Sequence, residues 1–385
     1  FDKDKKQVVI ANKYDFIDIN QFYIDFQIIE DGYEIYKGTT KLPALKPNTI
    51  AKIKLPYNVE LNQEKESFIN LQLRLKEANH WADKDYAMAH WQFAINKIDN
   101  RLQEVKESKE AFLVQEDKTQ LTLENKGFKI SFDKQNGEIL YWKYDGFEVI
   151  SDRKGSPHYN NNRWIENDKH GDSISGELAS TCEIKLNKEK TKAEIKITTK
   201  GEKCPYTIEY TIYSNNIVDM KVTLNPIVEG LRRLGLGMIF SKDFEEIDYY
   251  AKGPWENYND RQEASFVGRY STTVSDMLTP YAHPQSCGNR QEMREIFLYK
   301  KGSTKGLKIE ANQPIAFSML HFDDKDFNKE KLHPWELNLR EEVYVHFDFV
   351  QRGLGNGSCG PQTIEKYQVP SSGTYSFTLR FSPLR

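Results

Sequence analysis

Residues 121–150 read LTLENKGFKISFDKQNGEILYWKYDGFEVI, a series of apolar and aromatic runs separated by short turns. The turns are Asn-Lys-Gly at 125–127, Asn-Gly at 136–137 and Asp-Gly at 145–146. Asn-Gly and Asp-Gly between apolar runs are strong short-range signals of a β-hairpin, because these residues readily adopt the backbone conformation that a tight hairpin turn requires. The stretch therefore predicts successive antiparallel strands in a meander.

The same strand pattern continues to the C-terminal end of the sequence. A tight turn at Asn215 and Asn216 separates two further runs, and no sustained helical periodicity interrupts the series. The expected strands lie near residues 193–199, 206–214, 217–225, 234–240, 247–250, 296–300, 307–310, 315–320, 343–350 and 375–381. We therefore expect residues 119–385 to form one large antiparallel β-sandwich.

The N-terminal hundred residues have a strand pattern of their own. Apolar alternation recurs near residues 8–10, 22–28, 33–36, 50–55, 68–75 and 86–95, and an Asp-Gly turn at 31–32 predicts a hairpin. About seven short strands in roughly a hundred residues is typical of an immunoglobulin-like sandwich. Residues 1–100 are predicted to form such a domain, in which core packing or strand-edge capping is expected for Trp91.

A charged stretch separates the two strand-rich regions. Residues 101–118 contain neither Gly nor Pro and show no sustained periodicity. We interpret them as a surface linker between two domains. The apolar residues Ile98, Leu102 and Val105 would give the join one short helical face, and hence some stiffness, if a helix formed there.

Composition limits the classes of partner. The 385 residues include 54 Lys and Arg against 57 Asp and Glu, with a formal net charge of −3. This balance provides no surplus of positive charge for phosphates, so we expect no nucleic acid partner. No run of about eighteen apolar residues occurs, so we expect no membrane span. An aromatic content of 12% favours half-buried strands.

The four cysteines indicate neither a metal site nor a disulfide framework. Cys182, Cys204, Cys287 and Cys359 form no C-x-x-C pair, so buried free thiols are expected. The chain starts at Phe1 without a signal-peptide pattern, and we interpret it as a piece of a longer protein. A cytoplasmic and a periplasmic location therefore both stay open.

Residues 252–294 combine rings with polar side chains in an unusual density. Trp255, Glu256, Asn257 and Tyr258 follow one another, and a second polar turn ends at Arg290. A sugar stacks its C–H faces on rings and pairs its hydroxyls with amides, carboxylates and guanidinium groups. The stretch therefore suggests a sugar-binding surface. The alternative is that these residues only hold loops together.

The motifs in this stretch resemble a known family. GPWENYNDR at 253–261, GRY at 268–270, TPYAHPQSCGNR at 279–290 and then Arg294 are similar to the small domain of the large β-galactosidases of glycoside hydrolase family 2. That pattern reads roughly GPxENYxDR…GxY…PYxxPQExGxR. Residues 157–169 and 333–361 resemble further segments of the same domain. Ser286 and Cys287 depart from the residues usual after Pro-Gln in the family.

The resemblance implies an architecture and a role. It points to an immunoglobulin-like domain followed by a galactose-mutarotase-like supersandwich. Retaining glycosidases use two carboxyl groups, which the family mounts in a (β/α)8 barrel. Strands do not alternate with helices here, so we expect the catalytic glutamates to lie upstream of Phe1 and this chain to supply one wall of the sugar site. The implied partners are a β-galactoside, the missing N-terminal domains and a second copy in a homo-oligomer; a divalent cation and sodium are possible in the full-length enzyme.

The resemblance also assigns site residues. The loop at 351–361 is similar to a family loop that reads roughly G-V-G-G-x-x-S-W-G, which places Cys359 where many members carry a sugar-stacking Trp. Either the enzyme does without this ring, or Trp335 or Tyr344 substitutes for it. The expected carbohydrate-binding residues are Trp335, Tyr344, Cys359, Glu256, Asn257, Tyr258, Asn289 and Arg290, and those expected to hold the motif together are Asp260, Arg261 and Arg294.

Two other classes of function stay open from the sequence. A stand-alone carbohydrate-binding module would use the same rings and polar groups without chemistry. A sugar epimerase would need a His and a carboxylate for proton transfer at a hemiacetal, and His321 and Glu310 lie on neighbouring expected strands. Fold analogy alone is a weak reason for the second reading.

Overall fold

The structure is a computed structural model that describes residues 1–106, 108–166, 177–355 and 360–384. Within these ranges the regular structure consists of strands and short 3-10 turns without any α-helix, which confirms the expected all-β class. No helix there has the length and apolar character needed to cross a bilayer. The chain forms two compact units, residues 1–99 with 266–269, and residues 100–265 with 270–385.

The first unit is a sandwich of two antiparallel sheets. One sheet pairs β1 with β4, and the other has the order β3-β2-β5-β6. Val8, Ile53 and Phe26 lie in one buried cluster, so both sheets share a core. The strands are β1 (Gln7–Ala11), β2 (Phe22–Glu30), β3 (Tyr33–Lys41), β4 (Ile50–Lys54), β5 (Ser67–Leu75) and β6 (Ala87–Asn96).

Two local predictions for this unit have different outcomes. The hairpin between β2 and β3 is confirmed, and Asp31 and Gly32 adopt φ angles of 46° and 82°. Both lie in the left-handed region, which glycine enters without steric cost. Of the two roles expected for Trp91, core packing is wrong, because its side chain is 44% exposed on β6, which is an edge strand of its sheet. Alternation along a strand identifies two faces but not which of them is covered.

The second unit begins with a five-stranded meander. Its order, β11-β10-β9-β8-β7, follows the chain, so each expected turn joins two hydrogen-bonded neighbours. The hairpins predicted from Asn-Lys-Gly, Asn-Gly and Asp-Gly are therefore confirmed. The strands are β7 (Leu113–Glu116), β8 (Gln120–Asn125), β9 (Phe128–Asp133), β10 (Ile139–Tyr144) and β11 (Phe147–Ile150).

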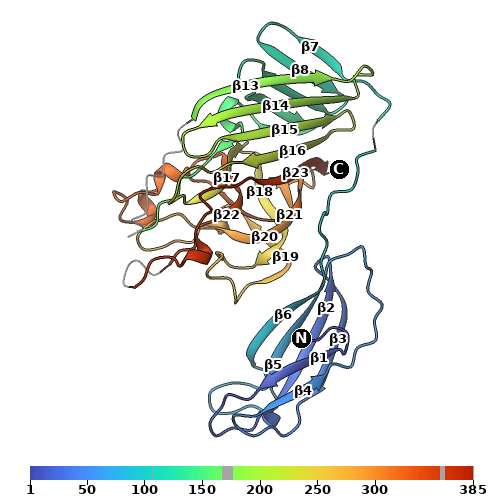
Figure 1. The fold of residues 1–385 in the computed structure, drawn as a ribbon, viewed down its shortest axis with the longest axis vertical. Helices are drawn as coiled ribbons and strands as arrows, with labels where there is room; N and C mark the ends of the chain where they lie inside the picture. Colours follow the sequence, from blue (N-terminus) through green and yellow to red (C-terminus); the bar gives the residue numbers. More distant parts are fainter. Residues whose placement is uncertain (107, 167–176, 356–359, 385) are drawn as a thin grey trace. The chain divides into compact units, whose positions relative to one another are not determined.

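A twelve-stranded sheet completes this unit. Its main path is β12-β17-β22-β21-β23-β16-β15-β14-β13. A branch leaves this path at β21, where β20 pairs with β21, β18 pairs with β20, and β19 pairs with β18. Figure 1 shows β13 to β16 and β23 side by side. The strands are β12 (His158–Tyr159), β13 (Glu177–Leu186), β14 (Lys192–Gly201), β15 (Tyr206–Tyr213), β16 (Ile217–Leu224), β17 (Arg233–Phe240), β18 (Phe244–Gly253), β19 (Phe266–Thr273), β20 (Arg290–Lys300), β21 (Gly306–Leu320), β22 (Val343–Gln351) and β23 (Tyr375–Leu384).

Aromatic side chains join the two sheets of the second unit. Trp142 on β10 packs edge-on against Phe381 on β23 with ring centroids 5.2 Å apart, and Phe132 on β9 packs against Tyr210 on β15 at 5.4 Å. Trp142 and Phe132 are fully buried. Burial of one such side chain contributes about 1.5–3 kcal/mol, so these contacts fix the five-stranded sheet on the larger one.

Residues 101–118, expected as a linker, run along the second unit. The Arg101 amide donates to the Asn312 carbonyl at 3.1 Å, and Arg380 donates to the Gln103 carbonyl at 2.6 Å. The short helical face is not formed, and residues 113–116 are strand β7. The 3-10 turns of the chain are η1 (Ile19–Gln21), η2 (Arg153–Gly155), η3 (Ser275–Met277), η4 (Asp324–Asp326), η5 (Pro334–Glu336) and η6 (Glu365–Tyr367).

Candidate functional site

Three loops of the second unit meet at one place, and we call them the loop cluster: residues 253–261, 281–290 and 351–355. Asn257 and Asn289 join the first two. The Asn257 amide donates to the Asn289 carbonyl at 2.9 Å, and the Asn289 side chain donates to the Asn257 carbonyl at 2.7 Å. The Asn257 side chain also accepts from the Gln291 amide at 2.9 Å. Both side chains are buried, so they replace backbone pairing that irregular loops lack.

Glu256 collects hydrogen bonds inside the same loops. It accepts from the Gly288 amide at 2.9 Å, from the Tyr258 hydroxyl at 3.3 Å and from the Tyr281 hydroxyl. Burial, followed by the hydrogen bond to Glu256, raises the pKa of Tyr281. Burial and the Glu256 charge also raise the pKa of Tyr258. Both phenols therefore stay neutral donors to the carboxylate.

Asp260 and Arg261 hold the third loop. The two carboxylate oxygens of Asp260 accept from the backbone amides of Leu354 and Gly355 at 3.0 and 2.9 Å. Arg261 donates to the Gly355 carbonyl at 2.6 Å. A pair of charge-assisted bonds to consecutive amides fixes the backbone direction of a loop. The Asp-Arg dipeptide thus sets the start of the segment that contains Cys359.

A buried polar network beneath the cluster was not predicted. Arg163 donates to the Gln351 side chain at 3.2 Å, to the Gly353 carbonyl at 3.4 Å and to the Arg352 carbonyl. Gln351 in turn donates to Asn289 at 3.3 Å and to Asp348 at 3.2 Å. The sequence gives no signal for this network except that Arg163 belongs to the segment 157–169, because its members lie far apart along the chain.

The two predicted arginines are also buried. Arg290 donates to the carbonyls of Gly288 and Asn289 at 3.2 and 3.3 Å. Arg294 pairs with Glu292 at 3.3 Å, and its guanidinium lies 5.5 Å from the ring centroid of Tyr250. Both side chains are at most 5% exposed. These contacts thus join β20 to the loop cluster and to Tyr250 on β18.

The remaining predicted residues lie apart from these contacts. Trp335, on η5, is 78% exposed, and its ring stacks on that of His333 with centroids 4.3 Å apart. Tyr344 is half-buried on β22. Cys359 lies outside the described residues, as do Asn167 and Asp168 of the segment that resembles the family. Among the predicted carbohydrate-binding residues that are described, Asn257, Tyr258, Asn289 and Arg290 are buried, whereas Glu256, Trp335 and Tyr344 retain exposed surface.

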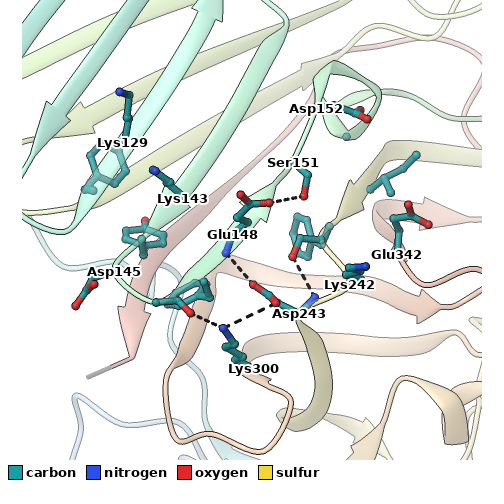
Figure 2. Close-up of a pocket in the computed structure, with 18 of the residues that line it drawn as sticks. Lys129, Lys143, Asp145, Glu148, Ser151, Asp152, Lys242, Asp243, Lys300 and Glu342 are labelled. Carbon is teal, nitrogen blue, oxygen red and sulfur yellow. Dashed lines mark hydrogen bonds and ion pairs between the residues drawn. The ribbon is translucent and has the colours of Figure 1, made fainter.

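A large charged cleft opens beside the hairpins of the five-stranded sheet (Figure 2). Its volume is about 950 Å³. Asp243 accepts from the Glu148 amide at 3.1 Å and faces Lys300 at 3.9 Å, and Glu148 accepts from Ser151 at 2.8 Å. Asp243 and Lys300 thus pair within the cleft wall, and Lys143, Lys154 and Glu342 add further charges to its lining.

Acid–base and metal chemistry find little support at the predicted positions. His321 contacts Glu245 at 2.8 Å and the Glu342 carbonyl at 3.0 Å, whereas Glu310 accepts from Lys308 at 2.8 Å. Burial acts to raise the pKa of Glu245, but the hydrogen bonds from His321 and Ser275 together outweigh it and lower the pKa. In the part of the chain that the structure describes, no group of three or more His, Cys, Asp or Glu side chains is arranged to hold a metal ion.

Known proteins resemble this chain over nearly its whole length. It is similar to a protein named beta-galactosidase from Priestia megaterium, with 21% identity over 100% of this chain and 38% of that protein. The beta-galactosidase of Streptococcus thermophilus is 24% identical over 99% of this chain and 38% of its own length. That of Actinobacillus pleuropneumoniae is 24% identical over 97% of this chain and 37% of its own length. The chain thus spans 37–38% of the length of these relatives.

Solved structures and family models match parts of the chain. The chain is similar to galactose 1-epimerase from Lactobacillus acidophilus NCFM, at 11% identity and a TM-score of 0.39 over 71% of this chain and 97% of that one. An aldose epimerase homologue from C. elegans matches at 10% identity and a TM-score of 0.37 over 71% of this chain and 98% of that one.

The family model "Beta-galactosidase, domain 4" matches residues 8–96, and "Beta galactosidase small chain" matches residues 124–381. Since the latter match covers well over half of the sequence, the chain belongs to the beta galactosidase small chain family.

Proposed function

We propose that this chain is the C-terminal part of a retaining β-galactosidase, which hydrolyses terminal β-D-galactose residues. The observation that carries the proposal is that proteins named beta-galactosidase match 97–100% of this chain while it spans only 37–38% of their length. Retaining hydrolysis needs a nucleophilic carboxylate and an acid/base carboxyl group roughly 5–5.5 Å apart. We assign that pair to other domains of the same protein.

The part played by this chain is to support the sugar site and form one of its walls. Asn257, Asn289 and Asp260 fix the loop cluster through bonds to backbone groups. Loops held in this way bind a ligand without losing further conformational freedom. The exposed rings of Trp255 and Trp335, at 76% and 78% exposure, are the surfaces on which a sugar face can stack.

A stand-alone carbohydrate-binding role is the second candidate. The exposed rings favour it, because rings that are not needed for packing are available to a sugar without any chemistry. An epimerase that uses His321 with Glu310 gains no support, since the carboxylate that contacts His321 is that of Glu245.

The test compares this chain with the longer protein that carries it. We expect the 385-residue chain to melt cooperatively and to release no nitrophenol from a nitrophenyl β-galactoside, whereas the longer protein hydrolyses it. The corresponding α-galactoside and β-glucoside serve as controls for specificity. Hydrolysis by the chain alone that survives repurification would contradict the assignment of the carboxylates to other domains.

A further inference from the structure

A second cleft lies over the polar face of β12, β17 and β22, and we call it the histidine cleft. Its volume is about 670 Å³, within the range of roughly 300–1,000 Å³ that small-molecule sites occupy. Its lining contains no residue of the loop cluster. The side chains that give it its chemistry are His158, Asn160, Asp324, Tyr344 and His346.

Strand register brings the two histidines to one face. His158 on β12 pairs with Gly237 on β17, and Gly237 pairs with His346 on β22. Directly opposite residues of antiparallel strands project to the same side. A Cβ at position 237 would lie 2.8 Å from the Asn160 amide nitrogen and 3.2 Å from His158 Nε2. Glycine at this position therefore leaves the space that both side chains occupy.

Asp324 fixes the polar end of the cleft. It faces His346 Nε2 at 3.0 Å and accepts from Asn160 at 2.9 Å. Burial acts to raise the pKa of Asp324, but the neighbouring His346 and then Arg233 outweigh it and lower the pKa to about 2. The carboxylate is therefore ionised at neutral pH and remains an acceptor.

His346 retains binding capacity that the described part of the chain does not use. Its side chain is 8% exposed, and its Nδ1 is buried without a hydrogen-bond partner among the described residues. Buried polar atoms are nearly always paired, so the unpaired Nδ1 beneath the lining of the cleft is a hydrogen-bonding group that this part of the chain leaves unused. A hydroxyl suits an imidazole nitrogen as a partner, because a hydroxyl both donates and accepts.

The same face of the sheet also carries apolar side chains. Tyr344 on β22 pairs with Ile239 on β17, two residues along from the pair of His346 with Gly237, and both line the cleft. A ring and an aliphatic side chain beside an amide, a carboxylate and imidazoles match a ligand that has C–H faces as well as hydroxyl groups. Arg340 at the edge is paired with Asp326 at 2.9 Å, so its charge is already compensated.

We propose that the histidine cleft is a second carbohydrate site, which binds one monosaccharide over the ring of Tyr344 and the neighbouring polar pair Asp324 and His346. The site differs from the wall of the galactosidase site proposed above and does not depend on it. Tyr344, which the sequence suggested as a ring for that site, then belongs to the second one. The neighbouring charged cleft shares Lys154, Ile239, Arg340 and Tyr344 with it.

Calorimetric titration of the 385-residue chain with D-galactose tests this site. We expect a dissociation constant on the order of 1 mM, as for a small ligand with few contacts. Tyr344→Ala and His158→Ala should each weaken binding at least tenfold. Lys143→Ala in the charged cleft should leave binding unchanged. Loss of binding with Trp335→Ala but not with Tyr344→Ala would place the sugar at the exposed ring of η5, and the absence of heat up to about 100 mM galactose would show that the cleft does not bind this sugar; either result overturns the proposal.

A second measurement needs no substitution, and so does not depend on whether a variant folds. Imidazole nitrogen signals in long-range ¹H–¹⁵N spectra should shift with galactose for His158 and His346. Those of His80 and His333, which are exposed elsewhere, should stay in place. Shifts confined to His333, beside Trp335, would overturn the proposal in favour of the exposed ring.

Discussion

The buried ion pair between Arg233 and Asp348 allows a sharp test of the structure. The guanidinium of Arg233 on β17 lies 3.0 Å from the carboxylate of Asp348 on β22, and their side chains are 3% and 0% exposed. Asp348→Asn keeps the shape of the side chain but removes the counter-charge that contacts the buried Arg233 directly, and the remaining carboxylate that acts on Arg233 is that of Asp324. Breaking a buried pair in this way costs about 3–5 kcal/mol of unfolding free energy.

Two comparisons test whether the burial of an ion pair, rather than the distance between its charges, sets the cost of breaking it. The ion pair between Lys242 and Glu341 has almost the same separation, 2.9 Å, but its side chains are 65% and 75% exposed. Glu341→Gln should therefore leave the free energy of unfolding unchanged within error. The double variant Arg233→Met with Asp348→Leu removes both charges, so it should be more stable than Asp348→Asn alone.

Urea denaturation followed by tryptophan fluorescence supplies the measurement, since Trp142 is fully buried in the unit that holds the pair. With a denaturant slope of about 3 kcal/mol/M, the expected loss lowers the midpoint by about 1–1.7 M. A loss below about 1 kcal/mol for Asp348→Asn would refute the reasoning. A double variant less stable than the single one would do the same.

Four further outcomes are expected. The pKa of Asp324 is lowered from 3.8 to about 2, so the stability that its charge gives the folded chain is fully present above about pH 4 and is lost as the pH falls toward 2. The melting temperatures of the chain and of Asp324→Asn should therefore converge across that window. Burial raises the pKa of the Cys287 thiol to about 12, so peptide mapping should find it unlabelled by Ellman's reagent at pH 8 until denaturant is added. Arg261→Ala removes a hydrogen bond worth about 1 kcal/mol and should lower the melting temperature by about 2–4 °C; an unchanged melt with lost galactoside affinity in the longer protein would make Arg261 a ligand contact. In that longer protein Trp335→Ala should weaken galactoside binding by about 1–3 kcal/mol without changing the melting temperature, and Cys359→Ala should change little; unaltered kinetics for Trp335→Ala would remove this ring from the site.

The pairing of strands that follow one another in the chain was predictable from the sequence, because the short turn between two such strands determines it. The turns at Asp31, Asn136 and Asn216 join strands that pair as expected, since the conformation of a short turn fixes which residues meet. The order of the large sheet was not predictable in the same way. β22 lies between β17 and β21, and β23 between β21 and β16. Such pairings are decided by burial across the whole core, which no short window of sequence contains.

The candidate site shows the same division between local and distant causes. The motif at 253–261 and 279–290 located the loop cluster, because its residues are close in sequence. The sequence did not indicate the network of Arg163, Gln351 and Asp348, because these polar residues lie far apart in the chain and only the fold brings them together in a buried position. The register that sets His158 beside His346 is likewise a property of the sheet and of Gly237.

Polar density in a loop has two physical causes that sequence alone does not separate. A ligand surface needs exposed donors and acceptors, whereas a buried irregular loop needs side chains that pair with its own backbone. Asn257, Asn289 and Asp260 serve the second need, as their bonds to backbone amides and carbonyls show. Substitutions at these positions should then alter stability and sugar binding together. Substitutions at exposed rings such as Trp335 should alter binding alone, and this contrast distinguishes a positioning residue from one that touches the sugar.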